Sequence, residues 1–209
     1  MKKPLFISAL VLAAIGAFAD GSINVGNGIS STRFPIYGPE LDSSGVCYVV
    51  GNGPLSAPTG STVYTGALLS GSRYAIEFWA GPSTATDFSG LTLITSTTFR
   101  TAANPNALPN GITLTTQATV PGVAVGAQAK LGVRVWDTLG AFSWHTASMR
   151  GQSPTLFLSS GLGGIDGGGN PVLSPNWVGE SFNISYLCPE PSVGGLMMLG
   201  MALVAWKRK

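Results

Sequence analysis

Apolar and polar residues alternate along much of the chain between residues 20 and 188, and no apolar repeat of helical period is sustained there. This pattern predicts strands. The predicted strands cover residues 45–50, 74–79, 91–100, 112–120, 129–136, 143–149, 155–158 and 181–187. Most have one polar face, as antiparallel sheets with one wet side do. We therefore expect an all-β fold, an antiparallel two-sheet sandwich or jelly roll of about 7–8 strands.

The segments between the predicted strands read as turns and loops. Pro121-Gly122 predicts a turn directly after the strand over 112–120. The glycine-rich residues 161–170 predict a mobile loop, since a strand pattern resumes beyond them. Residues 20–40 are weakly patterned and predict either an edge strand or a partly loose arm.

The N-terminus has a different pattern from the rest of the chain. Met1-Lys2-Lys3 is basic, residues 5–18 are apolar apart from Ser8 and Gly16, and Ala17-Phe18-Ala19 is a small-x-small site. These three parts predict a secretory signal peptide over residues 1–19, with signal peptidase cutting after Ala19. A retained membrane anchor is the alternative, which the short apolar run disfavours.

The C-terminus carries a second apolar run, over residues 193–206, which contains no charged residue. A helix of this length spans roughly 21 Å at 1.5 Å per residue, short of the ~30 Å hydrocarbon core of a bilayer. We expect a short transmembrane helix there, held only marginally. The three cations that follow it, Lys207, Arg208 and Lys209, form a basic stop that stays on the cytoplasmic side.

An extended tether, Pro189-Glu190-Pro191-Ser192, precedes this run, and Ser192 can cap the helix. The Pro189-Glu190-Pro191 triplet, the apolar run and the basic stop together resemble the PEP-CTERM sorting signal of bacterial exported proteins. The resemblance covers residues 189–209, about a tenth of the chain. It implies cleavage near the triplet by an exosortase and delivery to the cell envelope or an extracellular polysaccharide matrix.

Two features of the tail depart from the family's pattern: it is rich in methionine, and Cys188 stands before the triplet. Cys188 therefore leaves the position of the cut open. The alternative to a cleaved signal is a permanent single-pass anchor, against which the short span argues. In either case the tail is expected to lie in the inner membrane at least transiently, with the domain over residues 20–187 outside.

The formal charge of +2 comes from the two ends. Residues 20–188 contain six basic and eight acidic residues, a formal charge of −2. The part expected to fold therefore gives no support for a nucleic-acid partner, which would require a basic patch.

Both cysteines lie in the exported part of the chain. A disulfide between Cys47 and Cys188 would close a loop of about 140 residues and contribute roughly 4–5 kcal/mol on the chain-entropy model. Two free thiols, or pairing of Cys188 with another molecule, are the alternatives.

Residues able to support catalysis are few. His145 is the chain's one histidine, and Asp137 could complete a relay with it, but no Gly-x-Ser-x-Gly nucleophile motif is present. Glu77, Asp137 and Glu180 could supply a carboxylate pair, although nothing in the sequence sets their spacing. The loop around Asp166 has too few oxygen ligands for calcium. We expect no catalytic residues, no metal and no cofactor.

Two tryptophans suggest a binding surface. On their predicted strands Trp79 and Trp136 share a face with Glu77 and Arg134, and an exposed aromatic platform of this kind would suit a polysaccharide. The alternative is that a loop covers the rings or that they close the core at strand ends. The sequence therefore predicts an envelope or matrix protein without catalysis; a secreted carbohydrate-binding module and a secreted hydrolase are the alternatives.

Overall fold

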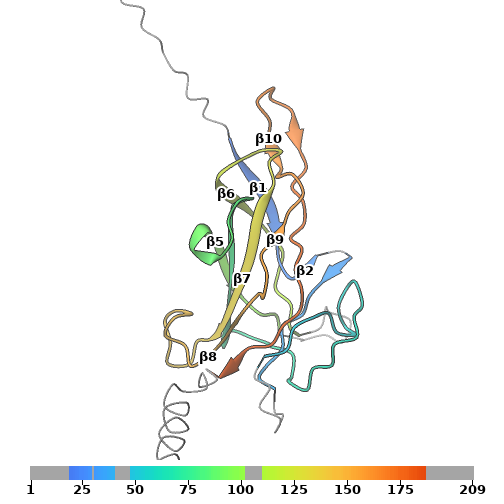
Figure 1. The fold of residues 1–209 in the computed structure, drawn as a ribbon, viewed down its shortest axis with the longest axis vertical. Coiled ribbons are helices and arrows are strands. Elements are labelled where there is room, and N and C mark those ends of the chain that lie inside the picture. The colour runs from blue at the N-terminus through green and yellow to red at the C-terminus, as the bar shows by residue number, and fades with distance from the viewer. Residues whose placement is uncertain (1–18, 30, 41–47, 102–109, 187–209) are drawn as a thin grey trace, which may run out of the picture.

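The computed structural model describes residues 19–29, 31–40, 48–101 and 110–186 (Figure 1). Apart from Ala19, the predicted signal peptide lies outside the described residues, as do the sorting tail and both cysteines. Nearly all regular structure within them is antiparallel β, which confirms the prediction of an all-β fold. No helix in this part of the chain is long and apolar enough to cross a membrane.

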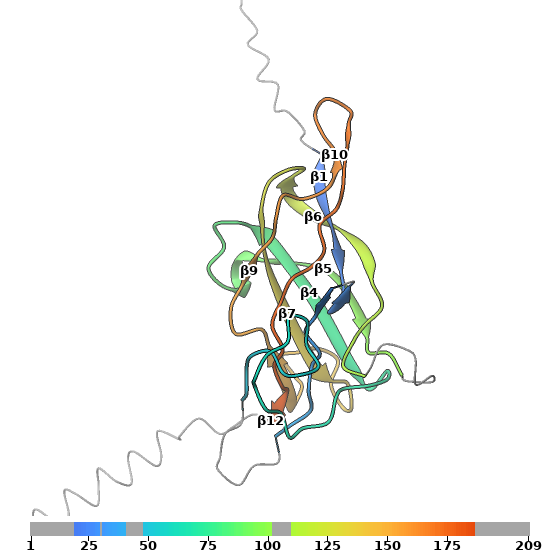
Figure 2. The same ribbon diagram turned by 90° about the vertical axis from the view of Figure 1, so that its right-hand side faces the viewer.

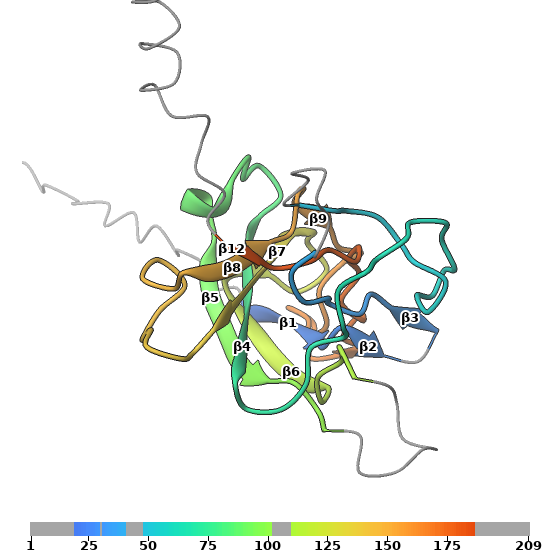
Figure 3. The same cartoon turned by 90° about the horizontal axis from the view of Figure 1, so that it is seen from below.

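The largest sheet, here called the main sheet, has six strands, all paired antiparallel. The first five follow the order β12 (Ser185–Tyr186), β8 (Met149–Gln152), β7 (Ala129–Asp137), β4 (Tyr74–Pro82) and β5 (Thr92–Thr98). The sixth, β9 (Phe157–Leu158), pairs with β7 beyond the end of β8. Figure 3 shows β8, β7, β4 and β5 on one side of the molecule.

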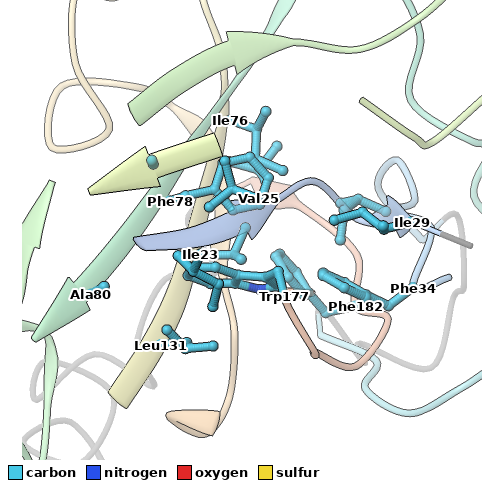
Figure 4. Packing of buried hydrophobic residues seen from close by; sticks show 14 of the residues in the cluster. Ile23, Val25, Ile29, Phe34, Ile76, Phe78, Ala80, Leu131, Trp177 and Phe182 are labelled. Atoms are coloured by element: carbon cyan, nitrogen blue, oxygen red, sulfur yellow. The ribbon is translucent and has the colours of Figure 1, made fainter. Parts of the chain in front are cut away.

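A second layer is formed by β1 (Asp20–Val25) and β6 (Thr116–Ala124), which pair antiparallel with each other. The inner face of the main sheet packs against this layer and against the irregular segments 34–36 and 177–184. Trp177, fully buried, meets the ring of Phe78 edge-on at 5.1 Å between centroids (Figure 4). The core therefore lies between the two layers.

Two small hairpins and one short helix complete the described structure. β2 (Gly28–Ile29) pairs with β3 (Thr32–Arg33), and β10 (Gly164–Ile165) pairs with β11 (Pro171–Val172). The helix is a single 3-10 turn, η1 (Phe88–Gly90). In the β10–β11 hairpin the carboxylate of Asp166 accepts hydrogen bonds from the backbone N–H groups of Gly168 and Asn170, so this acid closes its own turn.

Three predicted strands, 74–79, 91–100 and 129–136, correspond to β4, β5 and β7 and are confirmed. The predicted strand over 143–149 is wrong: the chain turns there, and β8 begins only at Met149. The prediction for 155–158 is met by the two residues of β9, and that for 181–187 by β12 with single bridges at Phe182 and Asn183. Of residues 45–50, the described part makes one isolated bridge, between Val50 and Phe182.

The turn predicted at Pro121-Gly122 does not end its strand. β6 runs through these residues as a bulge, because Gly21 faces Val120 whereas the preceding Asp20 faces Ala124. Gly122 takes a positive φ of 73°, a conformation that glycine adopts without steric cost. The bulge lets one strand continue past a Pro-Gly pair that would end a regular ladder.

The weakly patterned residues 20–40 are not a loose arm. Ile23 and Val25 of β1 and Ile36 beyond it are fully buried, and Phe34 is 1% exposed. The predicted loop over 161–170 forms most of the β10–β11 hairpin. Both segments therefore belong to the folded unit.

Replacing Trp177 tests the packing between the layers. Trp177→Ala should lower the free energy of unfolding by about 3–5 kcal/mol, because it leaves a large cavity in a closed core. Trp177→Phe should cost less, since the buried indole N–H has no hydrogen-bond partner in the described structure. Leu173→Ala, at a side chain 94% exposed, is the control and should change stability by no more than about 0.5 kcal/mol. Urea unfolding measures all three, and a Trp177→Ala value equal to the control would contradict this packing.

Candidate binding surface

The face of the main sheet that points away from β1 and β6 is called the outer face here. In the register of β4 and β7, Glu77 lies opposite Arg134, Ala75 opposite Trp136, and Trp79 opposite Gly132. Because successive side chains of a strand alternate between faces, Trp79 and Trp136 share the outer face with the Glu77–Arg134 pair between them.

Trp136 does not form an exposed platform. It is only 7% exposed, because Ala141, Trp144 and Ala147 of the loop over residues 138–148 pack on it. For Trp136, the alternative of a covering loop holds and the platform hypothesis is wrong. Trp79 is half-buried, and its indole N–H donates to a carboxylate oxygen of Glu77 at 2.9 Å.

Arg134 is surrounded by aromatic rings. Its guanidinium carbon lies 4.4 Å from the ring centroids of Phe88 and Trp144 and 5.0 Å from that of Trp79. Rings of this kind attract a cation electrostatically, most strongly when water is excluded. Burial lowers the pKa of Arg134, and the nearby charge of Glu77 opposes that shift.

Phe88 reaches the sheet because β7 has a glycine beneath it. A Cβ atom on Gly132 would lie 2.7 Å from Cζ of Phe88 and 3.0 Å from a side-chain carbon of Leu156. Asp87 fixes the start of η1, since its carboxylate accepts hydrogen bonds from the hydroxyl group of Ser89 at 2.6 Å and from the backbone N–H of Ser89 at 2.8 Å. These hydrogen bonds lower the pKa of Asp87. Glycine at position 132 therefore allows two side chains to cover the sheet here.

Trp144 is held in place by contacts with β8. Its indole N–H donates to the carbonyl of Gly151 at 2.9 Å, and the guanidinium of Arg150 lies 4.4 Å from its ring. Arg150 also donates to the backbone carbonyls of Trp144 and His145, at 2.9 and 2.5 Å. The ring is thus fixed on the outer face by two adjacent residues of β8.

Two grooves lie beside this cluster. The Phe88 groove, about 530 Å³, is lined by Phe88, Lys130, the polar segment 83–87 and residues 152–156. The Trp144 groove, about 340 Å³, is lined by Trp144, Arg150, Tyr48, Ser185 and residues 151–154. Gln152, Ser153 and Pro154 belong to both, so the two grooves share a wall. The Phe88 groove contains one aromatic ring and the Trp144 groove two, and each has hydroxyl groups and one cation beside them, the arrangement of a polar binding surface.

The base of the loop over residues 138–148 is fixed by an ion pair. Arg73 donates from Nε and Nη2 to one oxygen of Asp137, at 3.0 and 2.6 Å. The other Asp137 oxygen accepts from the backbone N–H of Leu139 at 2.9 Å. The hydrogen bond from Arg73 lowers the pKa of Asp137 and raises that of Arg73, while partial burial of Asp137 opposes the first shift.

The residues considered for catalysis are dispersed. His145 is exposed beside the ring of Trp144, while Asp137 bonds to Arg73 and Leu139, and no hydrogen bond in the described structure joins the two. Glu77 lies on the outer face. Glu180 lies near Tyr48 and Tyr64, whose pKa values are raised mainly by burial and further by the charge of Glu180. In the described part of the chain, no group of three or more His, Cys, Asp or Glu residues could hold a metal ion.

Sequence reasoning does not find much of this surface. The alternation pattern gives no reason to single out Phe88, Arg150 or residues 152–154, and it offers Trp144 only as a possible member of an exposed tryptophan patch. The alternation of side chains along a strand places Trp79 and Arg134 on the same face of the sheet. The approach of Phe88 and Trp144 depends on how two loops fold over the sheet.

Comparison with protein-family models, curated proteins and solved structures finds no match to this chain. The inferences that follow therefore depend on its own residues.

Replacing Asp137 by asparagine should make the protein less stable at neutral pH and less sensitive to acid. The pKa of Asp137 in the folded state lies below its ordinary value of 3.8, so its contribution to stability is complete above that value and is lost as the pH falls through the lower, folded-state pKa. In Asp137→Asn this part of the acid-induced loss should be absent. Thermal unfolding between pH 7 and pH 2 measures it, and parallel curves for the two proteins would show that the ion pair contributes nothing.

Proposed function

We propose that this protein is an exported component of the bacterial cell envelope or extracellular matrix, sorted by its C-terminal tail. The observation that carries the proposal is the fixed order of Pro189-Glu190-Pro191-Ser192, an uncharged apolar run and Lys207-Arg208-Lys209. That order resembles the PEP-CTERM signal. The resemblance implies an exosortase at the C-terminus as a processing partner, and the pattern of residues 1–19 implies signal peptidase at the N-terminus.

The first and last described strands fit this processing. β1 begins at Asp20, the first residue after the predicted signal-peptidase site, and the carboxylate of Asp20 accepts from the backbone N–H of Gly122 at 2.9 Å. β12 ends at Tyr186, three residues before Pro189. Neither cut would remove a described strand. The exported unit would be a two-sheet sandwich delivered whole.

Processing of the tail can be tested by intact mass of the protein recovered from outside the inner membrane. The mass should correspond to a chain that starts at Asp20 and lacks the apolar run and the basic stop. Pro189→Ala combined with Pro191→Ala should block the cut and leave the full tail, whereas Pro171→Ala, in the exposed β11, should be processed normally. A wild-type protein that retains Lys207-Arg208-Lys209 outside the membrane would overturn the sorting proposal.

A second function, binding of a polysaccharide, is favoured by the joined Phe88 and Trp144 grooves. A sugar polymer presents CH faces, which suit aromatic walls, and hydroxyl groups, which suit hydroxyl, amide and guanidinium partners. The lining supplies both kinds of group within one continuous wall at residues 152–154. Hydrolysis is less favoured, because the described lining contains one acid, Asp87, and a two-carboxylate mechanism requires a second facing it.

This binding function predicts that Trp144→Ala weakens binding of a soluble polysaccharide by roughly tenfold or more, as truncation of a central aromatic anchor does. Lys130→Ala, in the larger groove and outside the Trp144 loop, should also weaken binding. Phe142→Ala is the matched control, since this side chain lies in the same loop and lines neither groove. Calorimetric titration against neutral and acidic polysaccharides measures the effect. Equal affinity in all three variants would exclude these grooves as the site.

A further inference from the structure

The loop over residues 138–148 exposes two large apolar side chains at its tip. Phe142 is 102% exposed and Leu139 is 76% exposed, although Ala141 between them is buried against Trp136. The base of the loop is fixed by Asp137 and its far side by Trp144. This held loop therefore presents a phenylalanine and a leucine to water, and large apolar side chains that gather on a surface can mark a membrane or protein contact.

The tip lies at the end of the main sheet where the described chain ends. Tyr74 pairs with Asp137, Trp136 with Arg150, and Met149 with Tyr186, so these registers place Tyr74, Asp137, Met149 and Tyr186 at one end of the sheet. The loop over 138–148 starts at that end and folds over the outer face of the sheet, beside β8 in Figure 1. β12 runs toward the same end, so the last described residue, Tyr186, lies at the end of the sheet where this loop starts.

The distance from Tyr186 to the proposed membrane segment is short. Val193, the first residue of the apolar run, follows Tyr186 by seven residues. Even a fully extended chain covers only about 25 Å in seven residues. While the tail is in the membrane, this end of the domain must therefore stay close to the bilayer surface.

We propose that Leu139 and Phe142 insert into the lipid interface on the export side of the inner membrane while the tail is anchored. This inference rests on the proposed sorting tail. The transfer of apolar side chains from water to the boundary between lipid headgroups and acyl chains is favourable. The tether keeps the loop at high effective concentration beside the bilayer. A run of 14 residues holds only marginally by itself, and the loop supplies a second point of attachment.

Photo-crosslinking in the full-length chain tests the contact. The chain with its tail uncut is reconstituted into vesicles of phosphatidylethanolamine and phosphatidylglycerol, with a photoreactive phenylalanine analogue at position 142. The matched control carries the analogue at position 173, because Leu173 is 94% exposed and follows β11, whose hairpin with β10 lies at the opposite end of the molecule (Figure 2). Lipid adducts detected by mass should be severalfold more abundant from position 142.

A second variant tests whether the contact holds the protein. Leu139→Ser combined with Phe142→Ser removes both apolar groups from positions that contribute little to the core. The ratio of vesicle-bound to free chain in a flotation assay should fall by about tenfold, while urea unfolding stays unchanged.

The outcomes separate the two proposals. A wild-type chain that does not float with vesicles overturns the tail anchor, and this inference with it. A chain that floats but gives equal lipid adducts from positions 142 and 173 overturns the loop contact and leaves the sorting proposal intact. Adducts from position 142 to a second copy of the chain would identify a protein interface there and overturn the lipid contact.

Discussion

Strand β7 carries a row of apolar side chains on its inner face and one large apolar side chain, Trp136, on its outer face, and this requires cover on both sides of the main sheet. On the inner face Leu131, Val133 and Val135 meet the second layer. On the outer face no further sheet packs over Trp136 in the described structure. The chain covers that ring with the loop that follows β7, and η1 covers the neighbouring Gly132. Because two short loops cover less area than a sheet, open grooves remain beside them. The loop over residues 138–148 also exposes two apolar side chains, Leu139 and Phe142, that do not pack on the sheet.

Arg134 lies where these two covering segments meet. Taking a guanidinium partly out of water is unfavourable, and the three rings around it, together with Glu77, offset that cost. The same contacts hold Phe88 and Trp144 against one cation, so the walls of both grooves are fixed before any ligand arrives. Rigid walls reduce the conformational entropy that binding would otherwise lose. An arginine suits this position because it stays charged even when its pKa is lowered.

Alternation predicted β4, β5 and β7 because each is a long strand with faces of different polarity. It failed where burial is achieved without regular strands. Phe34 is buried in an irregular segment whose backbone bonds to the side chain of Asn27, which also accepts from the backbone N–H of Thr113 at 2.8 Å. A residue buried in an irregular segment, such as Phe34, cannot be identified from the hydrophobic period of the sequence. The alternation of side chains along each strand placed Trp79, Trp136, Glu77 and Arg134 on one face, but it could not show that a loop buries Trp136. The meeting of Phe88 and Trp144 at Arg134 joins residues from three separate parts of the chain, and only tertiary structure can bring them together.

The loop over residues 138–148 connects the proposed functions physically. Trp144 faces the sheet and lines a groove, whereas Phe142, two residues earlier, points into solvent at the end where the chain leaves toward the tail. The pair of Arg73 and Asp137 fixes the start of this loop relative to the sheet, so the two side chains cannot move independently over large distances. A polymer held in the Trp144 groove would therefore lie close to the bilayer as long as the tail is anchored. Cutting the tail would free Phe142 from the lipid without disturbing Trp144, because the contacts that hold Trp144 all come from the sheet and its loops. The domain could then leave the membrane with its ligand still bound.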